Sequence, residues 1–290
     1  RRGSSLFSSS SSRWPSVVEQ APRRPETIES EIIWAFFADY EALDFLATRS
    51  LDEGETARVG PSRAVFAMYE SAARFRKACR HRDRRRPLVL AVKSEDFLAG
   101  VEAMLPAFEA LGAAIHAAAV KDVLGNVHKL RRNGATSRPI PDLVLEDYAK
   151  DLQLHPDSSA QAFVWLFRIL KFTADFFHRL VHQSDQSLST SLTRAYDSTL
   201  GKHHNVVMRS IAVALMQIIP DKADMVYCFG LPDFDHLKPV LTHWLLHVQP
   251  VLDRLHAFHG DLKLKFPDGP SREHHFFHDA GLLLPAPAST

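Results

Sequence analysis

The chain has 290 residues and carries 35 Lys and Arg against 34 Asp and Glu, so its formal net charge is +1. This even balance gives no indication of a nucleic-acid-binding protein. Apolar residues make up 46% of the chain, too many for global disorder, and 12 glycines are few for a turn-rich all-β fold. Two cysteines, Cys79 and Cys228, cannot form a disulfide framework, and they favour a reducing compartment such as the cytoplasm. No apolar run reaches the about 18 residues that a membrane-spanning helix needs.

The N-terminal part divides into two segments of different composition. Residues 1–28 are rich in Ser, Arg and Pro, which predicts a disordered leader, with an organelle transit peptide as the alternative. Residues 29–90 form a predicted helical extension, because apolar residues recur at helical spacing near 32–46 and again near 62–79.

A basic run closes this extension, with eight cations between Arg74 and Arg86 and one acid, Asp83. Such a run attracts anionic lipid, but it is equally typical of a solvated linker. Residues 1–90 contain 16 basic and 12 acidic side chains, so the near-neutral total conceals a basic N-terminal third and a mildly acidic remainder.

Helical patterns fill residues 91–260, which we interpret as one all-α domain followed by a tail, 261–290. Strand-like alternation is absent. The first pattern is one apolar stripe from Phe97 to Ile115, with Ser94 as its expected N-cap. The further helices are expected at about 118–132, 142–151, 158–183, 189–219 and 235–258, with Pro250 expected to kink the last of them.

Three polar residues share one face of the helix predicted near 118–132. Asp122, Asn126 and Lys129 fall within about 60° of one another at 100° per residue. A carboxylate, an amide and an ammonium group suit a polyhydroxyl ligand, although the same pattern also fits an ordinary solvated face.

An apolar stripe on the next long helix begins at Trp165 and continues through Ile169, Phe172 and Phe176. An indole at the mouth of a cavity covers a sugar ring well, whereas a tryptophan in such a stripe is also typical of a core. Arg168 and Lys171 lie on the flank of this helix, where they face an anionic group or solvent.

The histidines do not form a catalytic or metal site by their spacing. His203 and His204 have no nucleophile motif around them, and one of them suits a bond to a ligand amide or carbonyl. His243 and His247, and the tail cluster around His274, lack acidic or cysteine ligands at characteristic spacing, so we expect no metal and no cofactor.

In this order these segments resemble the glycolipid transfer protein family over roughly residues 94–258. The resemblance rests on Phe108-Glu109-Ala110-Leu111-Gly112 before the Asp122/Asn126/Lys129 helix, on Trp165-Leu166-Phe167-Arg168-Ile169-Leu170-Lys171-Phe172, on Ala195-Tyr196 through His204, and on Pro220-Asp221-Lys222. It implies a two-layer all-α sandwich, with a headgroup site above an apolar pocket for ceramide chains.

The resemblance also implies residue roles. Asp122 would accept sugar hydroxyls and the ceramide amide N–H, Asn126 and Lys129 would bond the sugar, Trp165 would stack on it, and His204 would bond the amide oxygen. The residues at chain-pocket positions are Leu111, Ile115, Phe172, Phe176, Leu200 and Met216. The family usually has an aromatic residue for membrane docking just past the histidine, where this chain has Asn205 and Val206.

The expected function is non-enzymatic transfer of one glycosphingolipid between membranes, in the cytoplasm and with transient contact to membrane surfaces. Relatives that carry ceramide-1-phosphate have a lysine at the position of Asn126 and arginines near that of Trp165, so this chain favours a neutral sugar. Arg168 and Lys171 keep ceramide-1-phosphate as the alternative, and a sphingolipid sensor or interaction protein is a second one. The oligomeric state is left open.

Overall fold

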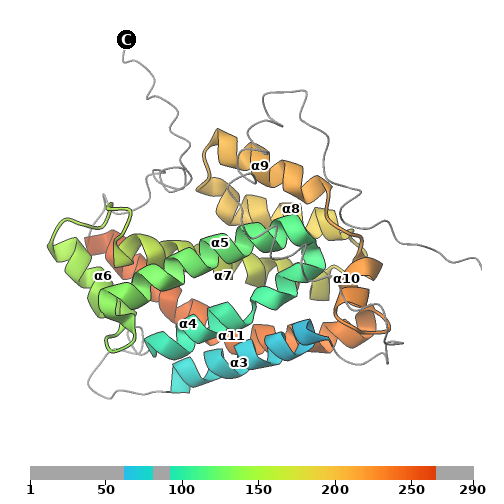
Figure 1. Cartoon of the computed structure of the whole chain (residues 1–290), viewed down its shortest axis with the longest axis horizontal. Helices are drawn as coiled ribbons and strands as arrows, with labels where there is room; N and C mark the ends of the chain where they lie inside the picture. Colours follow the sequence, from blue (N-terminus) through green and yellow to red (C-terminus); the bar gives the residue numbers. More distant parts are fainter. Residues whose placement is uncertain (1–61, 81–91, 266–290) are drawn as a thin grey trace, which may run out of the picture. The chain divides into compact units, whose positions relative to one another are not determined.

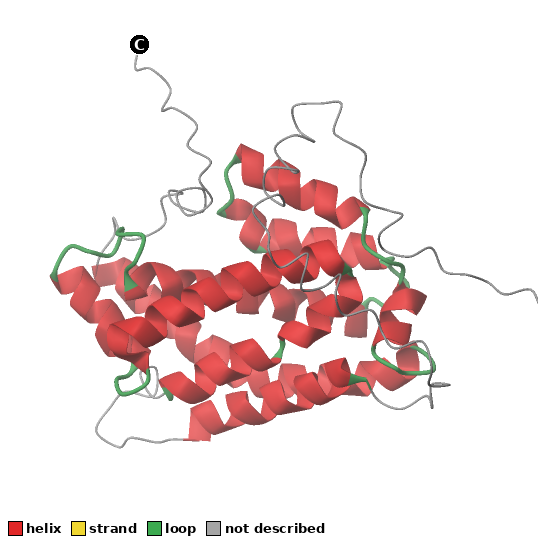
Figure 2. Ribbon diagram, in the orientation of Figure 1, coloured by secondary structure: helices red, strands yellow, loops and turns green. Residues whose placement is uncertain are grey.

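The computed structural model describes residues 62–80 and 92–265, and every regular element in these ranges is a helix (Figure 2). The all-α expectation is therefore confirmed for this part of the chain. The leader 1–28, the helical pattern near 32–46, residues 81–86 of the basic run and the tail from 266 lie outside the described residues.

The described elements follow one another in the order labelled in Figure 1. They are α3 (Arg63–Arg80), α4 (Ser94–Ala103), η3 (Leu105–Leu111), α5 (Ala113–Leu130), η4 (Arg131–Ala135), α6 (Ile140–Ala149), α7 (Ser159–His182), α8 (Leu188–Ser198), η5 (Leu200–Lys202), α9 (Val206–Gln217), α10 (Lys222–Cys228) and α11 (Phe234–Lys265). No described helix combines the length and apolar character that crossing a bilayer requires.

The helix α7 lies at the centre of the packing and contacts α5, α6, α8 and α11. Figure 1 shows it behind α5. Its predicted start is confirmed, because the Ser158 side chain accepts a hydrogen bond from the Gln161 backbone N–H. Phe163, Leu166 and Leu170 are fully buried, which anchors the Trp165-bearing helix rigidly in the core.

The single stripe predicted from Phe97 to Ile115 is wrong as one continuous helix. The chain leaves α4 at Met104, forms the 3-10 segment η3 and begins α5 only after Gly112, whose φ is 95°. Pro106 lacks a backbone N–H and therefore favours this break in the first turn of η3. The stripe residues nevertheless stay buried or half-buried. Ser94 is not an N-cap, because its hydroxyl accepts the Ile140 N–H at 2.7 Å.

The helix predicted over 189–219 is also divided. α8 ends at Ser198, and α9 starts after Asn205, whose side chain accepts the Met208 N–H at 2.9 Å. In between, Gly201 lies so close to Tyr196 that a Cβ at this position would meet the Tyr196 carbonyl oxygen at 3.1 Å. The break positions His204 in a connection between two helices rather than inside one.

The structure adds α10, capped by the Asp221 side chain, and extends α11 through Pro250 to Lys265. The helix α10 was not predicted, whereas α11 was expected over about 235–258 and ends later than expected, at Lys265. The helix expected to end near 132 ends at Leu130, and Gly134 has a φ of 106° in the segment that follows, a conformation that favours glycine.

The helix α3 shares the hydrophobic core of the helices that follow it. Phe75 and Trp244 of α11 are both fully buried and meet edge to face with ring centroids 6.0 Å apart. The Trp244 indole N–H donates to Ser71 Oγ at 2.9 Å, and this hydroxyl donates to the Gly100 carbonyl at 2.7 Å. Residues 63–80, which we assigned to the N-terminal extension, thus pack with α4 and α11, while the other predicted domain limits stay predictions.

Candidate functional site: a polar headgroup site on α5 and α7

The three polar residues predicted to share a face do so on α5. The Asn126 side-chain amide donates to the Asp122 backbone carbonyl at 2.8 Å and to Asp122 Oδ1 at 3.1 Å. Lys129 Nζ donates to the Pro156 carbonyl at 3.2 Å, in the connection that leads into α7. Because the side-chain amide nitrogen of Asn126 donates to Asp122, the acceptor that Asn126 offers a ligand is its carbonyl oxygen.

Asp122 has the electrostatics of a binding residue rather than of a solvated surface carboxylate. Burial raises its pKa from the ordinary 3.8 to about 7, even though the Asn126 hydrogen bond and the Lys129 charge act in the opposite direction. The Asn126 hydrogen bond and the Lys129 charge offset only part of the cost of burying the Asp122 carboxylate. Hydrogen bonds from the hydroxyl groups of a ligand would stabilise it further.

Trp165 of α7 and His204 of the α8–α9 connection lie side by side, with ring centroids 5.7 Å apart. The Tyr196 hydroxyl of α8 is 2.9 Å from His204 Nδ1. Burial, and secondarily the nearby Arg168 charge, lower the pKa of His204 to about 4. The imidazole is therefore neutral at neutral pH and has one nitrogen as a donor and one as an acceptor.

Tyr196 had no assigned role in the sequence analysis, although it belongs to the motif that carries the resemblance. Burial raises the pKa of its phenol to about 12, so the hydroxyl keeps its proton. When this hydroxyl donates to His204 Nδ1, the imidazole hydrogen resides on Nε2. That tautomer presents an N–H donor, which is what a ligand amide oxygen requires.

Arg168 and Lys171, the two cations considered for an anionic headgroup, lie in different surroundings. The Arg168 guanidinium carbon is 5.1 Å from the centroid of the Trp165 ring, within the polar site, and burial lowers the pKa of this side chain to about 10. Lys171 is exposed and instead lines a groove of about 1010 Å³ between α7, the end of α8 and α11. Of the predicted site residues, this groove includes Lys171 alone.

The six residues predicted to line the chain pocket all take part in one hydrophobic core. Leu111, Phe176 and Met216 are buried members of that core. Ile115, Phe172 and Leu200 are partly buried and pack against it. Their neighbours are therefore apolar, as alkyl chains would require, while their role in lipid binding stays a prediction.

The histidine pairs do not extend into a metal site within the described part of the chain. His243 and His247 have ring centroids 4.7 Å apart, and residues 62–80 and 92–265 hold no group of three or more side chains suited to a metal ion. His274 and its neighbours in the tail lie outside the described residues.

Comparison with known proteins supports the resemblance. The family model for glycolipid transfer protein (GLTP) matches residues 92–230, just under half of the chain. This stretch is similar to a glycolipid transfer protein domain. The resemblance stated from the sequence is confirmed, and the family consists of lipid transfer proteins.

Curated relatives are identical to this chain at about a quarter of the aligned positions. The mouse protein named Pleckstrin homology domain-containing family A member 8 is 27% identical over 184 residues, covering 58% of this chain and 35% of the relative. A glycolipid transfer protein of Aureobasidium melanogenum is 26% identical over 176 residues, covering 60% of this chain and 87% of the relative. This chain thus spans about a third of the length of the first of these relatives.

Solved structures confirm the GLTP fold. The FAPP2 structure, described as selecting simple glycosphingolipids with the GLTP fold, has a TM-score of 0.52 at 24% identity and covers 60% of this chain and 87% of its own. Human ceramide-1-phosphate transfer protein in complex with its lipid has a TM-score of 0.58 at 16% identity and covers 69% of this chain and 97% of its own. At these identities the likeness concerns the fold alone, and ligand choice has to be argued from side chains.

Proposed function

We propose that this protein binds one glycosphingolipid and moves it between membranes without chemically altering it, as a cytoplasmic carrier that touches membranes transiently. The sugar would lie on Asp122, Asn126 and Lys129, with Trp165 stacked on the ring and His204 bonded to the ceramide amide. The observation that carries the proposal is the pair of acceptors on α5, the Asp122 carboxylate and the Asn126 carbonyl oxygen, held together by their own hydrogen bonds.

These acceptors support a sugar over a phosphate because hydroxyl groups donate hydrogen bonds, whereas phosphate oxygens accept them. A ligand without sugar hydroxyls would leave the Asn126 carbonyl oxygen without a ligand donor and Asp122 with fewer donors than a sugar supplies, and the cost of an unpaired buried polar group, about 1–3 kcal/mol, is the basis of selectivity here. Each alkyl methylene moved into an apolar pocket contributes about 0.8 kcal/mol, which offsets the loss of bilayer contacts.

Arg168 favours a second candidate, ceramide-1-phosphate. Its guanidinium lies beside Trp165 and His204 in a partly desolvated position, where a phosphate would pair with it. The separation of Lys171 from this site weakens the candidate, because the phosphate would have one nearby cation of the two considered.

The deciding experiment is native mass spectrometry of the full chain purified from cells, which reports the mass of the lipid that copurifies. A hexosylceramide supports the proposal, and a ceramide-1-phosphate replaces it with the second candidate. Transfer of the identified lipid between donor and acceptor vesicles by catalytic amounts of protein then distinguishes a carrier from a sensor that only holds its ligand. Release of free sugar would show an enzyme and contradict the proposal.

A further inference from the structure

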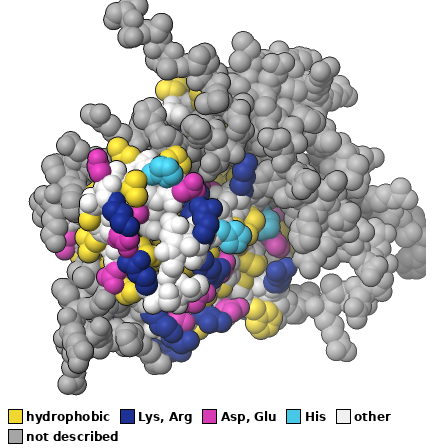
Figure 3. Space-filling model, turned by 60° about the vertical axis from the view of Figure 1, so that its left-hand side comes forward, with side chains coloured by type: hydrophobic (Ala, Val, Ile, Leu, Met, Phe, Trp, Pro, Cys, Tyr) yellow, Lys and Arg dark blue, Asp and Glu magenta, His cyan; other side chains and the backbone are white. Residues whose placement is uncertain are grey.

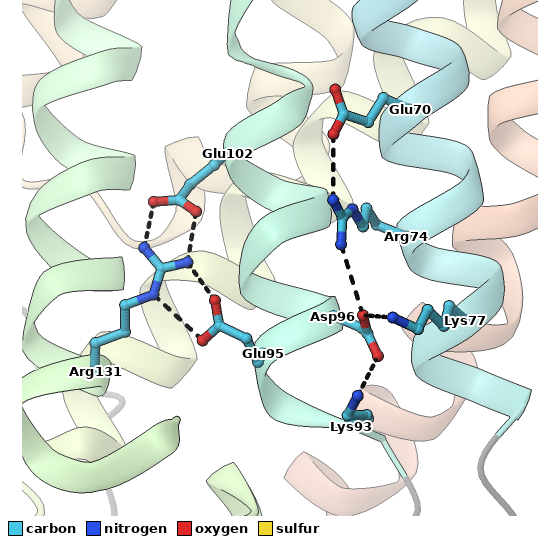
Figure 4. Close-up of polar contacts among 8 residues, drawn as sticks. All are labelled: Glu70, Arg74, Lys77, Lys93, Glu95, Asp96, Glu102 and Arg131. Atoms are coloured by element: carbon cyan, nitrogen blue, oxygen red, sulfur yellow. Dashed lines mark hydrogen bonds and ion pairs between the residues drawn. The ribbon is translucent and has the colours of Figure 1, made fainter. Parts of the chain in front are cut away.

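A second charged arrangement lies where α3 ends and α4 begins, and it involves none of the residues of the headgroup site. Lys77 Nζ and Lys93 Nζ each lie 3.0 Å from a carboxylate oxygen of Asp96, and an Arg74 guanidinium nitrogen lies 4.0 Å from it. Figure 4 shows the three cations converging on this one carboxylate from α3 and from the start of α4. We call Arg74, Lys77 and Lys93 the basic cluster.

The carboxylate at the centre of the basic cluster is buried, whereas the lysines around it are exposed. The Asp96 side chain is 4% exposed, whereas Lys77 and Lys93 are 59% and 51% exposed. Burial would raise the pKa of Asp96, but hydrogen bonds from Lys93 and Lys77 outweigh it, and the pKa lies below its ordinary value. Asp96 is therefore ionised and internal, while its partners present their charge to solvent.

On the other side of α4, acidic side chains outnumber basic ones. There Arg131 alone pairs with two carboxylates, Glu95 at 2.7 Å and Glu102 at 2.6 Å (Figure 4). Neighbouring faces of one short helix thus differ in the sign of their excess charge. Figure 3 shows the side of the molecule that lies at the left of Figure 1, with Lys and Arg side chains spread among acidic ones.

The backbone of Lys93 is hydrogen-bonded to the end of α3. The Lys93 N–H donates to the Ala78 carbonyl at 3.0 Å, so the residues that flank segment 81–91 lie next to the basic cluster. In sequence that segment contains four arginines and one acid, Asp83. The proposed site itself consists of the three described cations.

We propose that the basic cluster is a docking site for bilayers that contain anionic lipid. Arg74 also pairs with the exposed Glu70 at 3.5 Å, so the three cations exceed the two carboxylates, Asp96 and Glu70, by one charge. An anionic surface presents many negative headgroups in one plane, which suits three half-exposed cations held around a buried carboxylate. Each basic side chain near such a surface changes the affinity about fivefold, and the attraction falls off within the Debye length. Docking by this site is independent of which lipid the headgroup site binds.

The test raises and lowers the net charge at the basic cluster and compares the effect on vesicle binding with that of equal charge changes on α6. In the full chain, Asp96→Asn adds one net positive charge, and Lys77→Gln/Lys93→Gln/Asp96→Asn removes one without leaving a buried carboxylate unpaired. The controls are Glu146→Gln and Arg138→Gln/Lys150→Gln/Glu146→Gln, because Arg138 and Lys150 also pair with one carboxylate, the more exposed Glu146 of α6, and the charge changes are the same. Cosedimentation with phosphatidylcholine vesicles, with and without phosphatidylserine, measures docking.

We expect Asp96→Asn to bind phosphatidylserine vesicles about fivefold more tightly, and the triple variant about fivefold more weakly, at low salt. Both differences should vanish at high salt and on phosphatidylcholine alone, and the α6 controls should match the unmodified protein. Equal effects at the two sites would show a response to net charge only and overturn the proposal. Tighter binding of the same variants to duplex RNA than to vesicles would assign the cluster to a nucleic acid instead. If the triple variant fails to fold, the binding of Asp96→Asn to phosphatidylserine vesicles decides the test: tighter binding supports the proposal, and unchanged binding contradicts it.

Discussion

The Tyr196 hydroxyl lies 2.9 Å from His204 Nδ1 and joins the last turns of α8 to the connection that follows it. Eight residues separate the two along the chain, and the break after Ser198 brings them together. Because Tyr196 is itself buried, it belongs to the support of the headgroup site and not to the surface that a lipid would touch.

Tyr196→Phe should weaken glycolipid binding about fivefold while the protein stays folded. The variant removes one hydrogen bond, worth about 1 kcal/mol, and with it the preference for the imidazole tautomer that donates from Nε2. Competition with a fluorescent glucosylceramide measures the affinity, and the melting temperature reports folding. Tyr227→Phe is the matched control, because the Tyr227 side chain on α10 is 78% exposed. Equal affinities for both variants would remove Tyr196 from the site.

Asp122→Val and Trp165→Ala should each abolish transfer of glucosylceramide or galactosylceramide between vesicles. The first removes the acceptor of the sugar hydroxyls and the second removes the stacking surface. Asp261→Val, a change at an exposed position of α11, provides the control for the loss of a carboxylate. Circular dichroism should show unchanged helix content for all three variants. Unimpaired transfer by both site variants would contradict the assigned headgroup site.

The same Asp122 predicts a pH-dependent difference in stability. Its pKa is about 7 in the folded protein and 3.8 in its ordinary environment, so between these values the folded chain binds more protons than the unfolded chain. The Asp122 contribution to the free energy of unfolding therefore falls as the pH rises from about 4 to about 7, by at most about 1.4 kcal/mol per pH unit.

Urea unfolding of the wild type and Asp122→Val at pH 4.5 and pH 8, values bracketing the folded pKa of about 7, isolates this contribution. The variant should gain stability relative to the wild type on going to the higher pH, because it carries no buried charge there. A stability difference independent of pH would show that Asp122 titrates normally.

Much of the fold follows from sequence periodicity alone. The buried stripe of α7 and its Ser158 cap were predictable because both depend on residues within a few turns of one another. The breaks at Met104 and Thr199 were not, since the apolar spacing continues across them. They depend on Pro106 and on the close approach of Gly201 to Tyr196, which a stripe of apolar residues does not reveal.

For the candidate site, the sequence predicted which residues share a helix face but not which residues of different segments meet. Residues on one face of one helix, such as Asp122 and Asn126, were grouped correctly by angle. Lys171 was grouped with Arg168 because both lie on one flank of the helix, but spacing does not reveal that α11 packs beside Lys171, which therefore lines the groove between α7 and α11. The contact of Tyr196 with His204 depends on a chain reversal, so only the folded structure reveals it.

Val206→Trp should increase association with neutral vesicles and the rate of lipid transfer. Val206 is the first residue of α9 and is 82% exposed, at the place where the resemblance expects a membrane-docking aromatic residue. An indole partitions well into the bilayer interface. Tyr227→Trp adds an indole at an exposed position on another helix and should leave both quantities unchanged. A stronger effect at Tyr227 than at Val206 would show that α10, and not the start of α9, contacts the interface of neutral bilayers.

Ser71→Ala should destabilise the whole helical domain by about 2 kcal/mol, because it removes the acceptor of the buried Trp244 N–H and the donor to the Gly100 carbonyl. The three residues belong to α11, α3 and α4, so the loss should appear as a shift of a single cooperative urea transition with an unchanged slope. Ser210→Ala at an exposed position of α9 is the control. A separate early transition, with the rest of the domain unaffected, would show that α3 unfolds by itself and that its packing does not stabilise the lipid-binding helices.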